Sequence, residues 1–447
     1  MKFPKLLNNI SGLQLYQLMR FSAFLFISII FTKIGLSRHD IGLFEAFMFI
    51  ASMVSFFWVN GLVQSFLPLY HSNHTYNVSG EHDEEKSPEI FNAFLLLTFF
   101  SIMAFVFGLI IKHNFSIFHI SGNVPFINLM LLYLLISNPP ILIEYIYLLK
   151  NRPEMIFCYG LITYVIQLVI VTGPVVIGYP IIWAIYGVLL MSILRFIWLI
   201  FVLIKYAKIK ISFPFIREHI RLGAPLILSS LLSGSAQYID GVIVTSKFDA
   251  ATFAIFRYGA KELPLTILLA NGLSNAMLPE FGKKFKFREN LATLRHKSMR
   301  LMNILFPLSM VIMLFSRWLY PRLFNPYFLR SADVFMIYLL LIIPRLVFPQ
   351  TILIGLKKTR IVMIASVVEI VFNVILSLYL VQFYNVVGIA LATVIVFVLE
   401  KAILVTYLYL KMGIPPNIYI PVKSYLTYSV LIIIIFVLID HRIINFV

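Results

Sequence analysis

The sequence predicts an all-α polytopic membrane protein, and three observations support that prediction. Hydrophobic residues make up 61% of the 447 residues and charged residues only 12%, whereas soluble domains carry about 25% charged residues. The mean hydropathy is +0.94. The apolar residues form continuous runs of about 20, the length of a membrane-spanning helix. They do not alternate with polar residues as in a β-barrel, so the spans are expected to be helical.

The first half of the chain contains six long apolar runs. The fourth contains Pro139-Pro140, and the fifth has Pro174 near its end. The start of the chain is basic and shows no small-residue cleavage site, so we expect an uncleaved first helix. The predicted helices cover about 17–34, 41–69, 91–111, 125–148, 155–178 and 181–204.

A basic stretch separates this half from a similar second half. Residues 205–221 read KYAKIKISFPFIREHIR and form the longest basic connection between two groups of apolar runs. We therefore expect an N-lobe over 1–205, a cytoplasmic inter-lobe linker over 206–221 and a C-lobe over 222–410. An extra hydrophobic segment should follow over 411–447.

The second half again contains six apolar runs. The eighth predicted helix is longer than an untilted span needs, so we expect it to tilt or to bend at Pro264. A run at 422–439 predicts a thirteenth helix, after which too few residues remain for a fourteenth. The six predicted helices cover about 222–244, 251–278, 301–316, 331–354, 361–382 and 386–410.

Two short patterns recur in both halves. Residues 60–68 and 271–279 share N-G-L-x-x-x-x-L-P, and residues 150–156 and 358–364 share K-x-R-x-x-M-I. The second pattern follows the fourth predicted helix of each half. The chain is therefore predicted to be two six-helix bundles that form a parallel repeat around a central cavity.

The net charge of +17 does not indicate a nucleic-acid partner. Lys and Arg concentrate in alternate connections, above all 205–221 and 280–300, as the positive-inside rule requires if the N-terminus is cytoplasmic. Cys158 is the only cysteine, so it forms no intramolecular disulfide. The histidines near residue 71 do not have zinc-site spacing, so we expect no bound metal.

Four groups of residues give the chain a resemblance to a known family. They occur in order along about 1–410 and lie at the ends or interiors of the predicted helices. The groups are Leu36-Ser37 with Gly42 and Asn60-Gly61-Leu62; Gly223-Ala224-Pro225-Leu226 with Asp240; Leu278-Pro279; and Leu356-Lys357-Lys358-Thr359 with Asn373 and 388–393. In these residues the chain resembles the polysaccharide and oligosaccharide flippases of the multidrug/oligosaccharidyl-lipid/polysaccharide exporter superfamily.

This resemblance implies a transport function. Such flippases move a polyprenyl-diphosphate-linked oligosaccharide, such as an O-antigen, lipopolysaccharide, capsule or exopolysaccharide repeat unit, from the inner to the outer leaflet by alternating access. The expected location is the bacterial inner (plasma) membrane. The expected partners are the lipid-linked oligosaccharide, membrane lipids and other polysaccharide-assembly membrane proteins.

Arg257 and Lys261 are the principal candidate for a substrate site. They are four residues apart inside an apolar run, so on a continuous helix they share one face. Pro264, Asn271 and Asn275 would continue that face. A cation at mid-bilayer costs roughly 2.5–3.5 kcal/mol, and a diphosphate would compensate two of them. The alternative is an ion pair with Asp240 or Glu262.

Four further cations lie inside or at the edge of predicted spans. Arg20, Arg195 and Arg345 are additional candidates for diphosphate binding, and Lys401 is the fourth. Arg20 could instead reach the membrane interface. Arg195 and Arg345 could instead pair with Glu369 or Glu144. The first copy of the repeat lacks cations that match Arg257 and Lys261, so we expect the C-lobe to hold the diphosphate and the N-lobe mainly to gate.

Asp240 and Glu369 are candidates for ion coupling. Each carboxylate shares a helix face with Ser, Asn or Gln side chains. Such stripes line water paths, but they also occur where helices simply pack. The sequence does not choose between proton, sodium and membrane potential as the energy source.

Other function classes fit less well. A drug or cation antiporter of the same superfamily should have carboxylates rather than Arg257 and Lys261 in its cavity. Lipid II flippases use cavity arginines, but they usually have fourteen helices. A glycan polymerase should have a large outer loop, whereas the longest one predicted here covers only about 316–330. With no nucleotide motif and no soluble domain, we expect neither an enzyme nor a cofactor.

Overall fold

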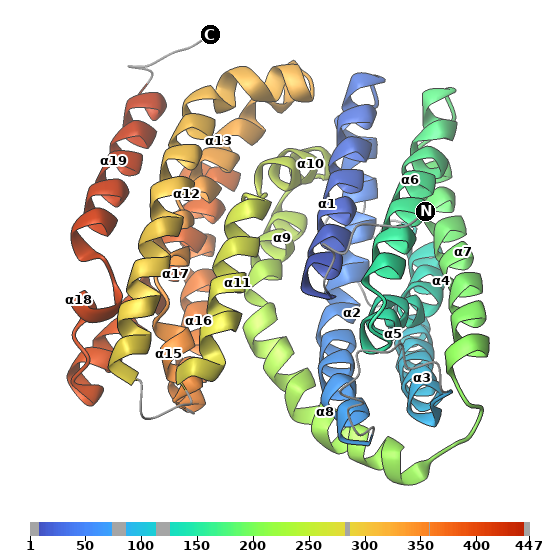
Figure 1. The fold of residues 1–447 in the computed structure, drawn as a ribbon. Coiled ribbons are helices and arrows are strands. Elements are labelled where there is room, and N and C mark those ends of the chain that lie inside the picture. Colours follow the sequence, from blue (N-terminus) through green and yellow to red (C-terminus); the bar gives the residue numbers. More distant parts are fainter. Residues whose placement is uncertain (1–8, 74–85, 113–125, 282–286, 357, 442–447) are drawn as a thin grey trace. The chain divides into compact units, whose positions relative to one another are not determined.

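The described part of the chain is helical. The computed structural model describes residues 9–73, 86–112, 126–281, 287–356 and 358–441, and its elements in these ranges are α-helices and short 3-10 turns (Figure 1). Eleven segments in these ranges are long and apolar enough to cross a membrane. The predicted all-α polytopic membrane class is therefore confirmed.

The helices divide into two compact units. The first contains Met1–Ser235 and Thr245–Ala251, and the second contains Ala236–Val244 and Thr252–Val447. The ranges predicted for the N-lobe and the linker both fall within the first unit, which also includes α8. Its helices are α1 (Asn9–Lys33), α2 (Arg38–Asn73), α3 (Pro88–Ile111), α4 (Ile127–Ser137), α5 (Leu142–Leu149), α6 (Pro153–Val176), α7 (Ile182–Tyr206) and α8 (Phe213–Gly234).

The second unit contains the remaining helices. Two of them, α9 (Ala236–Lys247) and α10 (Ala250–Gly259), also contribute a few residues to the first unit. The others are α11 (Pro264–Phe281), α12 (Phe287–Leu323), α13 (Leu329–Leu339), α14 (Ile342–Arg345), α15 (Pro349–Gly355), α16 (Thr359–Tyr384), α17 (Val386–Met412), α18 (Pro416–Tyr419) and α19 (Val422–Asp440).

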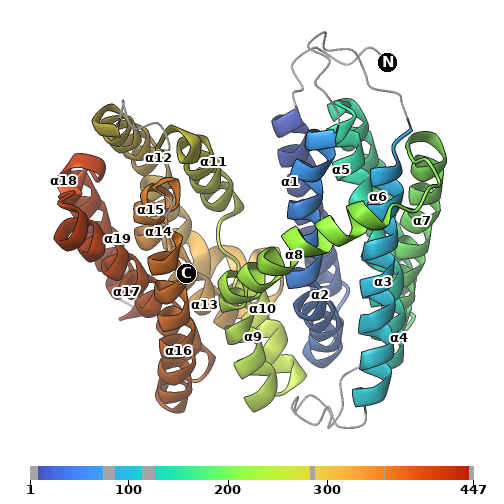
Figure 2. The ribbon, with the colours of Figure 1, turned by 90° about the horizontal axis from the view of Figure 1, so that it is seen from below.

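The first unit is organised by close packing of α8 along α2, which Figure 2 shows from below. A Cβ atom on Gly61 would lie 2.5 Å from Ile227 Cγ1 and 2.6 Å from the Ile227 backbone nitrogen. Glycine at 61 therefore allows the two backbones to approach. The buried cluster beside this contact combines aliphatic side chains with large aromatic ones, including Trp58 and Tyr159.

Buried aromatic stacking organises the second unit. Tyr258 on α10 stacks with Phe324 and Phe328, with ring centroids 5.1 and 4.9 Å apart. The Tyr320 hydroxyl donates to the Tyr258 carbonyl at 3.0 Å, and the Ser331 hydroxyl donates to the Ile255 carbonyl at 2.7 Å. These contacts anchor α10 against α12 and α13.

Several predicted helices are divided at prolines or small residues. The predicted helix 125–148 becomes α4, a 3-10 turn at Pro139–Ile141, and α5. The predicted helix 331–354 becomes α13, α14 and α15, because Pro344 and Pro349 lack the N–H groups that a continuous helix requires. The predicted helix 222–244 is divided between Gly234 and Ala236 into α8 and α9.

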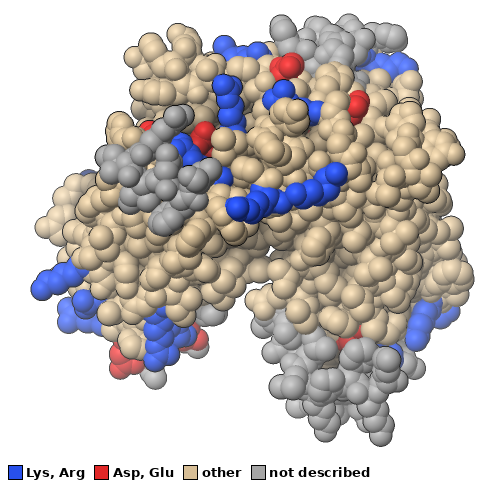
Figure 3. All heavy atoms as spheres, turned by 90° about the horizontal axis from the view of Figure 1, so that it is seen from above, with Lys and Arg blue, Asp and Glu red and all other residues tan. Residues whose placement is uncertain are grey.

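The surface agrees with membrane insertion. Most of the face visible in Figure 3 carries neither acidic nor basic side chains, as the low charged fraction of 12% requires. The hydrophobic segment near the C-terminus forms α19, which meets the length and hydropathy criteria for a span. Predicted helices 7 and 8 are each divided in two, and neither is among the spans found in the described residues.

Candidate functional site

The segment that carries Arg257 and Lys261 contains a break. Instead of one helix over 251–278, α10 ends at Gly259, residues 260–263 are not helical, and Pro264 begins α11. Proline is favoured at the first position of a helix, where its missing N–H group costs nothing. The prediction of one continuous helical face was therefore wrong, because the proline starts a new helix instead of bending the old one.

The break separates the residues of the predicted stripe. Arg257 lies on α10, Lys261 lies in the non-helical segment, and Asn271 is exposed on α11. Asn275 lies in α11 as well, but its side chain is outside the described residues. Arg257 and Lys261 are both half-buried. Lys261 Nζ lies 4.9 Å from the centroid of the Tyr258 ring, within range of a cation–π contact.

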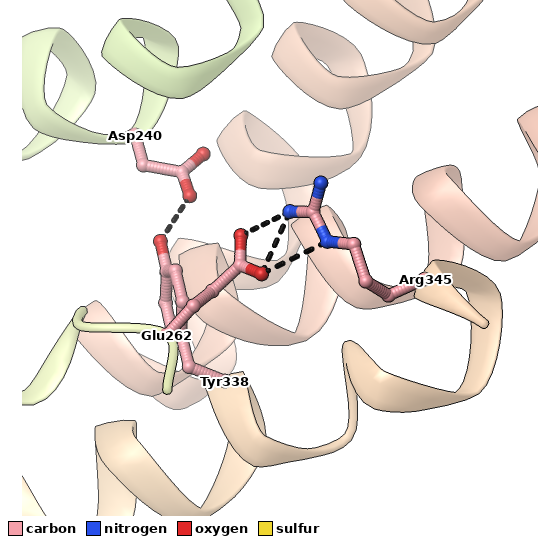
Figure 4. Close-up of polar contacts among 4 residues, drawn as sticks. All are labelled: Asp240, Glu262, Tyr338 and Arg345. Atoms are coloured by element: carbon pink, nitrogen blue, oxygen red, sulfur yellow. Dashed lines mark hydrogen bonds and ion pairs between the residues drawn. The ribbon is translucent and has the colours of Figure 1, made fainter. Parts of the chain in front are cut away.

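Arg345 forms a bidentate ion pair with Glu262 (Figure 4). Its Nη2 lies 2.5 Å from Oε1 and 2.7 Å from Oε2 of Glu262, and its Nε donates to Oε2 at 3.1 Å. Glu262 belongs to the non-helical segment 260–263, and Arg345 is the last residue of α14. The ion pair thus joins two breaks in the helical structure, and Glu262 takes the place of the predicted partners Glu369 and Glu144.

Phe397 on α17 lies beneath two cations. The Arg345 guanidinium is 5.0 Å and Lys401 Nζ is 4.7 Å from the centroid of its ring. Lys401 also contacts Glu400 Oε2 at 2.8 Å and donates to Gln350 Oε1 at 3.2 Å. Both cations are thus compensated by carboxylates within the second unit.

Asp240 is buried on α9 and is held by hydroxyl groups. The Thr393 hydroxyl lies 2.7 and 2.6 Å from the two carboxylate oxygens. The Tyr338 hydroxyl lies 2.5 Å from Oδ2, a contact that Figure 4 shows. Asn373 Nδ2 donates to Thr393 at 3.2 Å, and the Ser377 hydroxyl donates to Asn373 at 2.9 Å. Helices α9, α13, α16 and α17 therefore assemble one connected polar network.

Glu369 lies near this network, and among the described residues no direct hydrogen bond joins the two. It is half-buried on α16, where it interacts electrostatically with Glu400, Lys401, Arg345 and Asp240. The structure therefore gathers both coupling candidates, Asp240 and Glu369, and the cations Arg345 and Lys401 in the second unit. Tyr338 and Thr393 belong to the same group; Thr393 is part of the 388–393 group that carries the family resemblance, whereas no pattern in the sequence indicated Tyr338.

The first unit contains a separate charged cluster. Arg195 on α7 donates from Nη2 to Gln167 Oε1 at 2.7 Å, and its guanidinium lies 4.7 Å from the centroid of the Tyr164 ring. Its Nε is buried without a hydrogen-bond partner among the described residues. Glu144 is only 9% exposed and interacts electrostatically with both Arg20 and Arg195. Two predicted cations are thus associated with one carboxylate from α5.

The donor types limit what these clusters can bind. Within the described ranges, no group of three or more His, Cys, Asp or Glu side chains could hold a metal ion. The network around Asp240 offers carboxylate, hydroxyl and amide oxygens, which suit a hard monovalent cation or a proton. The half-buried cations Arg257 and Lys261 suit a phosphate group.

Comparisons with known proteins give a consistent family and fold. A family model described as "Polysaccharide biosynthesis protein" matches residues 36–333. Comparison with curated protein sequences finds no match. The fold is similar to that of a lipid II flippase, MurJ, in an inward closed conformation, with a TM-score of 0.67 and 19% identity over 96% of this chain and 92% of that one.

Two transporters of the MOP superfamily have the same fold. An outward-facing multidrug resistance MATE family transporter gives a TM-score of 0.55 and 13% identity, over 90% of this chain and 94% of that one. A transporter from Pyrococcus furiosus, described as having a binding pocket of reverse polarity, gives a TM-score of 0.55 and 12% identity, over 91% and 96%. The names of these structures denote flippases and transporters.

Proposed function

Because this chain belongs to the polysaccharide biosynthesis protein family, we propose that it moves a polyprenyl-diphosphate-linked oligosaccharide across the membrane. The family match to a multi-pass chain with the fold of MOP-superfamily flippases and transporters is the observation that carries the proposal. The glycan would be a repeat unit of an O-antigen, capsule or exopolysaccharide. The membrane would be the bacterial inner membrane, with the N-terminus in the cytoplasm.

Arg257 and Lys261 are proposed to bind the diphosphate. Both are half-buried beside the break between α10 and α11. A guanidinium and an ammonium are complementary to two adjacent phosphates. Arg345 would contribute only if the substrate displaced Glu262 from it. Arg20 and Arg195 would form a secondary contact in the first unit, where Glu144 already compensates part of their charge.

Asp240 is proposed to couple transport to a cation gradient. Its buried carboxylate accepts hydrogen bonds from the neutral hydroxyls of Tyr338 and Thr393, and within the described ranges no ion pair compensates its charge. A buried carboxylate in that setting favours uptake of a proton or a small cation. Glu369 is the second coupling candidate.

A flipping assay in proteoliposomes tests the function. A fluorophore on the glycan of the polyprenyl-diphosphate substrate is bleached by external dithionite, and flipping exposes the inner-leaflet pool. We expect Arg257→Gln combined with Lys261→Gln to slow exposure at least a hundredfold, because each of the two lost charge-assisted hydrogen bonds contributes roughly 1.5–3 kcal/mol. The control, Arg288→Gln with Arg295→Gln, removes the same charge from the exposed face of α12. It should leave the flipping rate unchanged.

Two further substrates separate the competing functions. Labelled lipid II shares the prenyl diphosphate, so preferential flipping of lipid II would assign the chain to lipid II transport. Active uptake of a cationic dye without flipping of either lipid would indicate a drug antiporter. Normal flipping by the Arg257 and Lys261 double variant would exclude these residues as the diphosphate site. It would not contradict the proposed transport function.

A further inference from the structure

Residues 208–222 combine basic and large apolar side chains on the surface of the first unit. The segment follows α7, whose candidate membrane span ends at Tyr206, and continues into the first turns of α8. Ile209, Ile211 and Phe213 are 85%, 56% and 76% exposed. Such exposure of three large apolar residues at alternate positions is unfavourable in water, so this surface is expected to contact an apolar phase or a partner.

The same segment is rich in exposed cations. Four exposed cations occur in it, two before Phe213 and two after it. They are Lys208, Lys210, Arg217 and Arg221. Arg217 and Arg221 are four residues apart on α8 and share one face. Mixed basic and apolar surfaces of this kind are typical of elements that lie in the plane of a membrane interface.

Packing against α2 fixes the orientation of this part of α8. Phe215, His219 and Gly223 form its buried face. His219 Nε2 lies 2.9 Å from the Leu62 carbonyl oxygen, and a Cβ atom on Gly223 would lie 3.1 Å from Ser65 Oγ. Since that face is held against α2, Arg217 and Arg221 must remain on the outer face.

The two arginines border a shallow hollow. Its volume is about 740 Å³. Apolar and charged side chains alternate around it, with two guanidinium groups against one carboxylate. The hollow is lined by Phe213, Pro214, Arg217, Glu218, Arg221 and Leu222.

We propose that residues 208–222 lie in the headgroup layer of the leaflet where α7 ends and bind an anionic phospholipid. Arg217 and Arg221 would contact its phosphate, because guanidinium groups form paired hydrogen bonds with phosphate oxygens. Phe213 and Ile209 would enter the boundary between headgroups and acyl chains. Charge complementarity selects an anionic over a zwitterionic lipid. This site lies outside the cation pair proposed for the transported diphosphate.

Lipid retention on the purified full-length protein tests the proposal. Native mass spectrometry counts the phosphatidylglycerol and phosphatidylcholine molecules, with matched acyl chains, that stay bound. We expect Arg217→Gln with Arg221→Gln to weaken phosphatidylglycerol binding by more than tenfold, at about fivefold for each cation removed, and to leave phosphatidylcholine unchanged. Arg217→Lys with Arg221→Lys should keep most of the binding.

The matched control separates a lipid site from general charge attraction. Arg288→Gln with Arg295→Gln removes the same charge from a helix face where residues 287–298 expose no large apolar side chain. Equal loss in this control would overturn the proposal. Binding of soluble glycerol phosphate as tight as that of phosphatidylglycerol would also overturn it, because the site would then be an anion site independent of the bilayer.

A depth measurement provides a second readout. Cys158 is the only cysteine, so Cys158→Ala combined with Phe213→Cys accepts one fluorescent label. Lipids with brominated acyl chains should quench this label at least twofold more than a label at Thr293→Cys, an exposed position on α12. Equal quenching at the two positions would show that residue 213 does not enter the bilayer and would contradict the proposal.

Discussion

Arg345 and Glu262 are joined by three hydrogen bonds although they lie 83 residues apart in the sequence. The pair connects the non-helical segment 260–263 to the end of α14. It therefore fixes the backbone next to Lys261, one residue of the proposed diphosphate site. We expect Arg345 to act on transport mainly by positioning that segment.

Loss of this ion pair should destabilise the second unit. Arg345→Gln leaves Glu262 without its cation. Fully buried pairs cost about 3–5 kcal/mol when one partner is removed, but these side chains are 24% and 21% exposed, so we expect about 1–3 kcal/mol. Denaturant unfolding in detergent measures the loss. The exchanged double variant, Arg345→Glu with Glu262→Arg, should recover at least half of it; no recovery would exclude a role for the direct pair.

Asp240→Asn should abolish the response to the coupling cation. The hydroxyls of Tyr338 and Thr393 can still bond to an amide, so the fold should persist, but the charge that attracts a cation is lost. In the wild-type protein, a saturating cation at 100 times its Kd should add about 2.7 kcal/mol of stability. Thermal unfolding with sodium or choline, and at several pH values, reveals which cation acts.

A matched aspartate provides the control for that experiment. Asp333 pairs with Arg317 at 2.9 Å, so Asp333→Asn removes a carboxylate that already has a cation. This variant should keep the cation response despite some loss of stability. A cation response that survives in Asp240→Asn and disappears in Asp333→Asn would assign the coupling site to Asp333 instead of Asp240.

Substitution of Gly61 should separate α2 from α8. Gly61→Ala places a methyl group 2.5 to 2.7 Å from atoms of Ile227, two of which belong to its backbone. Overpacking of this kind costs about 1–3 kcal/mol. Gly173→Ala in α6 is the control, because its Cβ meets nothing within 4 Å and alanine favours a helix. Equal stability of the two variants would show that the α2 and α8 backbones tolerate separation.

Stability should decrease at acidic pH through His219. Burial lowers the pKa of this imidazole from its ordinary value of about 6.5, while its hydrogen bond with the Leu62 carbonyl acts in the opposite direction. The folded state therefore binds fewer protons than the unfolded state just below pH 6.5, so the stability decreases as the pH falls below that value.

His219→Gln should reduce this pH dependence. The glutamine amide can donate to the Leu62 carbonyl in place of Nε2, but it does not titrate. Unfolding temperatures at pH 7.5 and 5.5 should therefore differ less in the variant than in the wild-type protein. His296→Gln changes an exposed histidine on α12 and should leave the pH dependence as it is. A larger pH effect in His219→Gln than in the wild type would contradict this explanation.

The sequence predicted an all-α polytopic membrane protein and the positions of most helices, because long apolar runs are a strong local signal. It located the irregular backbone near Pro264, but the stripe from Arg257 to Asn275 assumed that the helix continues through the proline. Pro344 and Pro349 around Arg345 carried a similar signal for the division of the predicted tenth helix. Local sequence indicates where a helix is weakened, but tertiary contacts decide whether it bends or ends.

The polar partners were harder to predict. Glu262 and Arg345 meet only because two separate helices break beside each other, and a single sequence holds no information on that proximity. Tyr338 and Thr393 are isolated hydroxyls within apolar runs and resemble ordinary packing residues. Asp240 was recognisable because a carboxylate inside an apolar run requires an explanation, whereas its hydroxyl donors do not.

Phe397 shows how a hydropathy scale can overlook an electrostatic role. Two cations, from Arg345 and Lys401, lie within about 5 Å of its ring centroid, where the negative face of the aromatic system attracts positive charge. Leucine would keep the residue apolar but would remove that attraction. Aromatic and aliphatic residues should therefore not be equivalent at position 397. Replacing one by the other would alter the electrostatics of the second unit while its hydropathy stays nearly the same.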